Sequence, residues 1–106
     1  MQDAVIDLPT LRGAADQACR LLKALGHPDR LLLLCQLSQG EMRVGELETM
    51  LGMTQPTLSQ QLGVLRDEKL VSTRRDGKSI YYSIASEPAL SVLRTLYDQF
   101  CPIPKE

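Results

Sequence analysis

A change of periodicity after Leu70 constrains the fold of this chain more than any other feature of its sequence. Before that point, apolar residues recur at steps of three and four, which indicates amphipathic helices. After it, residues 71–75 and 79–84 are short runs of strand-forming residues, separated by Asp76-Gly77. Asp-Gly favours a tight hairpin because both central residues of such a turn need a positive φ. The chain is therefore predicted to be mainly α-helical with one small β-hairpin.

Five helices are expected, four before the hairpin and one after it. Each has an apolar stripe along one side, and helix-starting or helix-ending residues lie at the predicted boundaries. Thr54 is expected to cap the fourth helix by accepting a backbone N–H with its hydroxyl. Pro102 and Pro104 are expected to end the fifth. The predicted helices cover residues 9–25, 28–39, 44–51, 55–67 and 87–100.

Length and composition place the chain among small single-domain proteins. It has 106 residues, no Trp and one Phe, so the core must consist mainly of aliphatic side chains. No apolar run approaches the roughly 20 residues that span a bilayer, and no signal-peptide pattern is present, so a cytoplasmic location is expected. Three cysteines without a Cys-x-x-Cys pair argue against a disulfide scaffold and a zinc ribbon. No cofactor is predicted.

Charge is distributed unevenly along the chain. The formal net charge is −1, which by itself does not indicate nucleic-acid binding. Residues 54–83, however, carry five Lys or Arg against three Asp or Glu, whereas the flanking segments are net negative. A local excess of positive charge is expected for a small surface that faces phosphates.

A short helix, a three-residue turn, a polar-faced helix and a basic hairpin follow one another in residues 44–84. This order predicts a winged helix-turn-helix, with the helix-turn-helix at 44–67 and the wing at 71–84 of one domain, residues 1–106, whose ordered core spans about 9–101. Short polar side chains on the fourth helix suit base edges and phosphates, and cations at the hairpin suit phosphate or a minor groove. The alternative is an ordinary surface helix with a hairpin that caps the core. The candidate DNA contacts are Gln55, Thr57, Ser59, Gln60, Arg66, Arg75 and Lys78.

Several segments resemble the ArsR (ArsR/SmtB) family of bacterial repressors over roughly residues 15–101. The resemblance implies a homodimeric winged-helix repressor that binds double-stranded operator DNA and is not an enzyme. The first and last helices would form the dimer interface, and their leucine-rich stripes agree with this independently. The matching segments are Leu25 to Arg30, Gly45-Glu46-Leu47, Gln55 to Arg66, Leu70-Val71, Arg74 to Lys78 and Tyr81-Tyr82.

The family's metal sites are not matched. Arg43 and Gly45 stand where metal-sensing members of the family place thiolates in the third helix, and neither can bind a metal. Members that bind zinc-like ions use paired His and acidic residues in the last helix. Here that helix contains Glu87 and Asp98 but no His. Zinc prefers a compact set of nitrogen and sulfur ligands, so no metal site is predicted.

Cys35 and Cys101 are the candidate sensing residues. From the residues alone they could be small buried hydrophobes or a reactive pair. Their positions and flanking residues resemble the persulfide-sensing branch of the family, the BigR and SqrR type. That resemblance implies that a reactive sulfur species, such as a low-molecular-weight persulfide, converts the pair into a disulfide or polysulfide bridge, and that the bridged repressor releases its operator. Cys19 is predicted to be a packing residue of the first helix.

Three alternatives remain at this stage. One is a metal or metalloid sensor that uses Cys35 and Cys101 with a ligand from the other protomer. Another is a general oxidant sensor, for which peroxide and persulfide would act equally. The third is a small thiol enzyme, which the lack of a helix-start Cys-x-x-Cys and of an evident base near either thiol disfavours.

Overall fold

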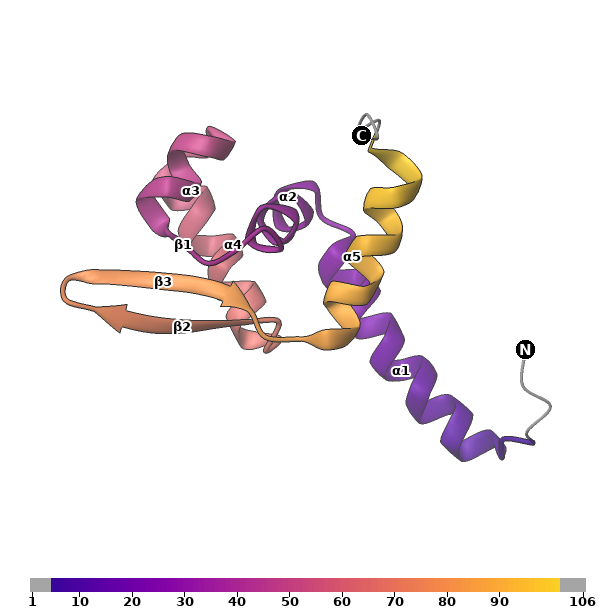
Figure 1. Cartoon of the computed structure of the whole chain (residues 1–106). Helices are drawn as coiled ribbons and strands as arrows, with labels where there is room; N and C mark the ends of the chain where they lie inside the picture. The colour runs from indigo at the N-terminus through magenta and orange to yellow at the C-terminus, as the bar shows by residue number, and fades with distance from the viewer. Residues whose placement is uncertain (1–4, 102–106) are drawn as a thin grey trace.

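The computed structural model describes residues 5–101, which form five helices with a small sheet on one side of them (Figure 1). The predictions of five helices and of a hairpin between the fourth and fifth are confirmed. The last helix ends at Phe100, and Pro102 and Pro104 lie outside the described residues. No helix among residues 5–101 is long and apolar enough to cross a bilayer. The elements are α1 (Leu8–Leu25), α2 (Pro28–Leu37), β1 (Met42–Arg43), α3 (Val44–Leu51), α4 (Gln55–Asp67), β2 (Val71–Asp76), β3 (Ser79–Ile84) and α5 (Glu87–Phe100).

The core lies where α2, α3, α4 and α5 meet the base of the hairpin. In α4, three leucines spaced by four and three residues share one face and are fully buried, as predicted. Val71 and Tyr82 close the core from the sheet. The helix that carries the candidate DNA contacts is therefore held by aliphatic packing on its opposite side. The largest fully buried side chains are Leu33, Leu34, Leu47, Leu58, Leu62 and Leu65.

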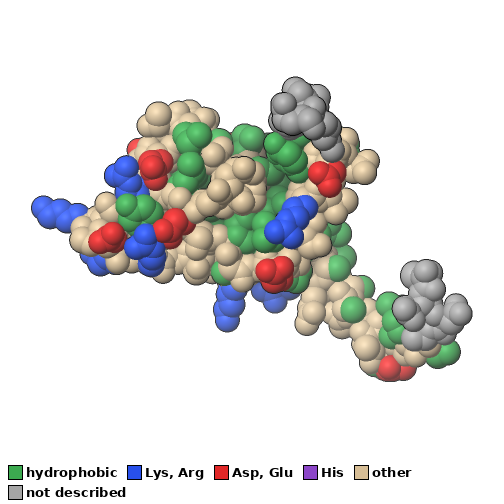
Figure 2. Space-filling model, in the orientation of Figure 1, with side chains coloured by type: hydrophobic (Ala, Val, Ile, Leu, Met, Phe, Trp, Pro, Cys, Tyr) green, Lys and Arg blue, Asp and Glu red, His purple; other side chains and the backbone are tan. Residues whose placement is uncertain are grey.

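Helix α1 projects away from this core over most of its length (Figure 1). Only Ala24 and Leu25, at its end, are buried. Leu11 and Leu22 remain 49% and 58% exposed, and Figure 2 shows hydrophobic side chains on the surface of the projecting helix. Apart from the last turn of the helix, the apolar stripe that predicts it is largely exposed within the described chain.

The sheet is antiparallel with strand order β1-β3-β2. Asp76 pairs with Ser79, so the two turn residues are Gly77 and Lys78. The prediction that Asp76 and Gly77 are the central pair is therefore wrong by one residue. Gly77, the first turn residue, has a φ of +64°, a conformation that glycine adopts without steric cost.

Two local predictions are also corrected. Thr54 lies at the N-cap of α4, but its hydroxyl bonds the Thr57 hydroxyl at 3.2 Å and no backbone N–H. Helix α2 ends at Leu37, before the predicted stop at Gly40. Its start is capped by His27, whose Nδ1 accepts the Asp29 N–H at 3.1 Å. Strand β1 was not predicted, because two residues are too few to show a period.

Candidate DNA-reading surface and dithiol site

Helix α4 presents a polar face opposite its buried leucines. Gln60 is exposed on this face and Gln55 and Ser59 are exposed on its flanks, as an element that reaches base edges requires. The turn that precedes the helix begins at Gly52, which has a φ of +67° and ends α3 in the left-handed conformation. Glycine suits this position because it has no Cβ to clash.

Two of the predicted DNA contacts are also used inside the chain. Thr57 is half-buried and shares the hydroxyl bond with Thr54. Arg66 is exposed but donates to the Tyr82 hydroxyl at 3.1 Å, which ties α4 to the sheet. The first contact lies at the start of α4, and the second joins the polar helix to the wing.

The neighbouring arginines of the wing have different environments. Arg75 and Lys78 are exposed near the hairpin tip, as predicted. Arg74 points to the other side of the strand, where its Nε lies 3.1 and 3.0 Å from the two carboxylate oxygens of Glu41. Its guanidinium also lies 4.5 Å from the centre of the Tyr81 ring. The Glu41 carboxylate therefore balances the charge of Arg74, whereas the exposed Arg75 remains available to a ligand.

The Glu41–Arg74 pair predicts a pH effect at the wing. Hydrogen bonding from Arg74 lowers the pKa of Glu41. The pair therefore stabilises the fold fully above the ordinary glutamate pKa, and this contribution is lost as the pH falls through the lowered folded value. Both groups are exposed, so the contribution is small. NMR titration of Glu41 should give a midpoint below the ordinary value, and Arg74→Gln should raise it. Arg75→Gln is the matched control, and an equal shift in both variants would contradict the assignment.

Arg30 joins three helices. From α2, its Nε and one terminal nitrogen donate to the carbonyls of Ala24 and Lys23 at the end of α1, at 2.8 and 3.1 Å. Its other terminal nitrogen donates to Oε1 of the buried Gln61 in α4, at 3.1 Å. Sequence reasoning missed this network because its partners are 31 residues apart along the chain.

Arg30→Met is expected to lower the free energy of unfolding by about 1–3 kcal/mol, because it leaves the buried Gln61 oxygen without this donor. Methionine keeps most of the apolar stem, so the loss reports mainly the hydrogen bonds. Chemical denaturation measures it, with the exposed Arg12→Gln as control. Gln61→Leu in the Arg30→Met background should recover part of the loss, and a purely additive double variant would argue against coupling.

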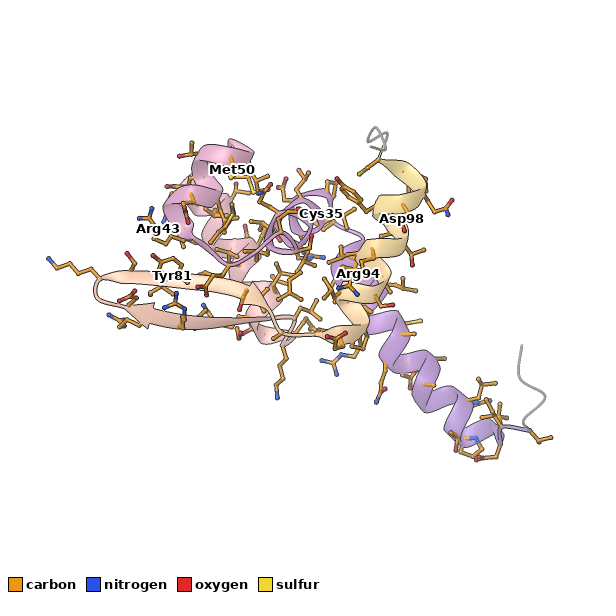
Figure 3. The ribbon with its side chains drawn as sticks, viewed as in Figure 1. Cys35, Arg43, Met50, Tyr81, Arg94 and Asp98 are labelled. Atoms are coloured by element: carbon orange, nitrogen blue, oxygen red, sulfur yellow. The ribbon has the colours of Figure 1, made fainter. Side chains whose placement is uncertain are left out.

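Of the two candidate sensing thiols, Cys35 lines a cleft of about 280 Å³ between α2 and α5 (Figure 3). Cys35 is half-buried and faces Leu90, Tyr97 and Asp98 of α5 across this cleft. Burial raises the pKa of the Cys35 thiol, and the negative charge of a Cys101 thiolate raises it further. Cys101 follows directly after α5 and is exposed. The pair thus combines a sheltered thiol with an accessible one nearby.

Cys19 does not share this environment. It lies on the projecting part of α1 and is exposed, so the predicted packing role is wrong within the single chain. All three cysteines are free thiols. Among residues 5–101, no group of three or more His, Cys, Asp or Glu side chains is arranged to hold a metal ion.

Comparison with known proteins agrees with this architecture. Residues 27–73 match the family described as bacterial regulatory protein, arsR family. The chain is 51% identical over 96 residues to the biofilm growth-associated repressor of Agrobacterium fabrum, covering 91% of this chain and 82% of the relative.

Solved structures confirm the predicted winged-helix fold. The transcriptional repressor BigR from Xylella fastidiosa superposes with a TM-score of 0.83 at 45% identity, covering 92% of this chain and 100% of that one. The homodimeric winged helix-turn-helix domain Mb0332 from Mycobacterium bovis gives 0.74 at 33% identity, covering 92% and 89%. The chain therefore belongs to the ArsR family of bacterial regulatory proteins and is a DNA-binding transcriptional regulator with a winged-helix fold.

Proposed function

We propose that the chain is a homodimeric, cytoplasmic repressor that binds a palindromic operator while Cys35 and Cys101 are thiols. A reactive sulfur species bridges the two thiols, and the bridged form releases DNA. The observation that carries the proposal is the half-buried Cys35 at the α2–α5 cleft, whose pKa responds to the charge of Cys101. The similarity to the BigR repressor supports the same reading.

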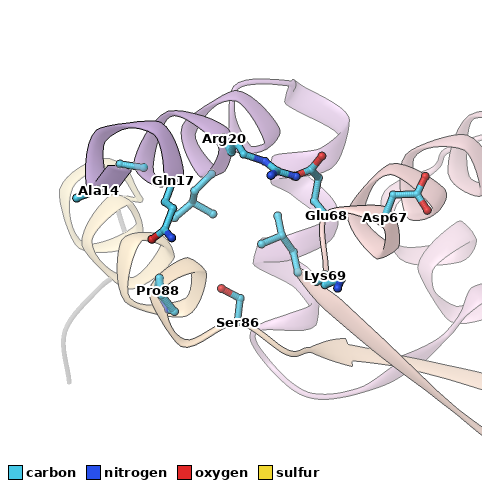
Figure 4. A pocket seen from close by; sticks show the side chains of 11 residues that line it. Ala14, Gln17, Arg20, Asp67, Glu68, Lys69, Ser86 and Pro88 are labelled. Carbon is cyan, nitrogen blue, oxygen red and sulfur yellow. The ribbon is translucent and has the colours of Figure 1, made fainter. Parts of the chain in front are cut away.

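Dimerisation through α1 and α5 is supported by the exposed apolar residues of α1, which a second copy would bury. A hollow of about 620 Å³ lies between α1, the end of α4 and the start of α5 (Figure 4). It is lined by Ala14, Ala18 and Leu21 on the α1 side. A partner helix would fill this hollow and extend the interface. Mb0332, which shares the fold, is described as homodimeric.

DNA binding is assigned to α4 and the hairpin. Gln55, Ser59 and Gln60 face outward from α4, with Thr57 beside them, while Arg75 and Lys78 extend the positive surface along the wing. A dimer presents two such surfaces, which must match half-sites about one DNA turn apart. A palindromic operator follows from the twofold symmetry.

Gln60→Ala should weaken binding to the operator by about 1–3 kcal/mol more than binding to random DNA, because an amide side chain can bond adenine through two hydrogen bonds. Competition binding by fluorescence anisotropy measures the difference. Lys78→Ala is the comparison, since loss of a phosphate contact weakens binding to both DNAs and reduces the salt dependence. Equal losses on the two DNAs for Gln60→Ala would show that Gln60 makes no base contact.

The sulfur chemistry needs a donor and two thiols. One protein thiolate attacks the sulfane sulfur of a persulfide, so that a protein S–S bond forms and the donor leaves as a thiol. The second protein thiolate attacks the modified cysteine and displaces hydrosulfide, which leaves a disulfide. If the protein persulfide first takes up a further sulfane sulfur, closure leaves a longer bridge.

The bridge acts on DNA through the position of the helices. It would hold α2 against α5, and α2 also contacts α4 through Arg30 and Gln61. A shift of α2 would therefore move α4 relative to α5, and so change the separation of the two reading helices. A coupling of only about 1–3 kcal/mol would change operator affinity roughly 5–150-fold.

The test combines intact-mass measurement with a DNA-binding assay. After persulfide treatment, the mass should show a bridged chain, with or without added sulfur, and operator affinity should fall. If peroxide lowers the operator affinity as much as persulfide does, and the intact mass shows no added sulfur, the protein is a general oxidant sensor. Tight stoichiometric zinc binding that releases DNA would favour a metal sensor. If persulfide, peroxide and zinc all leave the operator affinity unchanged, the proposed switch is refuted.

A further inference from the structure

The cleft beside Cys35 contains a pair of opposite charges that bridge formation by itself does not require. Arg94 and Asp98 of α5 both line the cleft and are exposed (Figure 3). The ion pairs found among residues 5–101 join other side chains, so neither group is engaged in one. The cleft therefore has one cationic and one anionic side chain that a small molecule could bind.

The charged groups share the cleft with Cys35, and Cys101 follows three residues after Asp98 along the chain. Along α5, Tyr97 follows Arg94 by three residues, and Cys101 comes four residues later, directly after the helix. Residues with this spacing lie on one side of a helix. That face borders the cleft, and Cys35 lies on the opposite wall. Near the cleft a small molecule could contact Arg94 while its reactive atom reaches Cys35.

The size of the cleft limits the ligand. Its volume of about 280 Å³ is at the lower end for small-molecule sites, which typically span about 300–1,000 Å³. A molecule of amino-acid or small-peptide size fits this space. The free cation and anion match a zwitterion, because a carboxylate forms strong paired hydrogen bonds with a guanidinium and an ammonium group bonds a carboxylate.

We propose that this cleft binds the sulfur donor and selects amino-acid-type hydropersulfides, with the donor's carboxylate on Arg94, its ammonium group on Asp98 and its sulfane sulfur toward Cys35. This rests on the proposed dithiol function and names its substrate class. Cys35 attacks the sulfane sulfur, the donor S–S bond breaks, and the donor leaves as a thiolate that takes up a proton. Cys101 then attacks the Cys35 sulfur and expels hydrosulfide. The two thiols lose two electrons, and the sulfane sulfur gains them.

Binding explains how a sheltered thiol can react quickly. Burial raises the pKa of Cys35, which lowers the thiolate fraction at a given pH and makes random collisions less productive. A donor held beside the sulfur converts the attack into a reaction within a complex, which increases the rate without any change in the thiol. Arg94 and Asp98 are therefore positioning residues that determine specificity.

The test uses three donors: L-cysteine hydropersulfide, its methyl ester, which lacks the carboxylate, and its N-acetyl form, which lacks the ammonium group. The rate of bridge formation is followed by quenched intact mass, and each rate is divided by that of the same donor with a free small thiol. The normalised rate should be about tenfold higher for the unmodified donor than for either masked one, as expected for loss of a charge-assisted contact.

In Arg94→Gln, the normalised rate with L-cysteine hydropersulfide should fall to that with the methyl ester, and the rate with the methyl ester should not change. Asp98→Asn should do the same for the N-acetyl donor. Arg12→Gln, which removes an equal charge on α1, should behave as the unaltered protein, and melting curves confirm that each variant folds. Equal normalised rates for the three donors, or an Arg94→Gln variant with undiminished selectivity, would overturn the inference while the dithiol function stands. Failure of every donor to bridge the unaltered protein would overturn both.

Discussion

Cys35→Ser is expected to retain full affinity for operator DNA and to lose the response to persulfide. The hydroxyl of serine is close in size to the thiol, and Cys35 lies on α2 away from the exposed face of α4, so DNA binding by the untreated variant should not change. The bridge, however, needs two sulfur atoms. A fall in affinity of roughly 5–150-fold in the unaltered protein should therefore disappear in the variant. Fluorescence anisotropy with labelled operator, before and after donor treatment, measures both quantities.

The controls use the other two cysteines. Cys101→Ser should behave as Cys35→Ser, because the bridge joins the two. Cys19→Ser should keep the full response, since Cys19 is exposed on α1 and lies outside the α2–α5 cleft. A Cys35→Ser protein that still releases DNA as the unaltered chain does would contradict the switch. Loss of the response in Cys19→Ser would move the sensing role to α1.

Leu33→Ala is expected to lower the free energy of unfolding by about 2–5 kcal/mol, because it leaves a cavity in the core. Leu33 is fully buried, at 0% exposed, whereas its neighbour Leu32 in the same helix is 49% exposed. Leu32→Ala should therefore cost well under half as much, although the composition changes identically. Urea denaturation at one fixed protomer concentration measures both, since dimerisation makes stability depend on concentration. Similar losses would show that the core does not lie where α2 meets α3 and α4.

Much of the fold could be predicted because its signals are local. The stripe Leu58, Leu62 and Leu65 indicates a helix with one buried side, and the structure buries all three. The strand runs around Gly77 likewise indicate a hairpin, although the turn is one residue later than predicted. These patterns depend on neighbours within one or two turns or across one tight loop, so the sequence contains them directly.

Other features depend on residues far apart in the chain. Arg74 could not be separated from Arg75 by sequence, because the difference comes from Glu41, 33 positions earlier. The two-residue strand β1, which follows Glu41, was missed because it is too short to show a period, and only its pairing with β3 identifies it. The internal roles of Thr57 and Arg66 depend on side-chain directions that only packing determines.

The sequence by itself determined the helices, the hairpin, the outward polar face of α4 and the family, because periodicity and short segments are local properties. The tertiary structure decided which charges remain free, that α1 keeps its apolar side exposed, and that Arg94 and Asp98 share a cleft with Cys35. The physical reason is that burial, pKa and charge pairing depend on distances in space. Those distances arise only when α2 and α5, which are separated along the chain by α3, α4 and the hairpin, pack side by side.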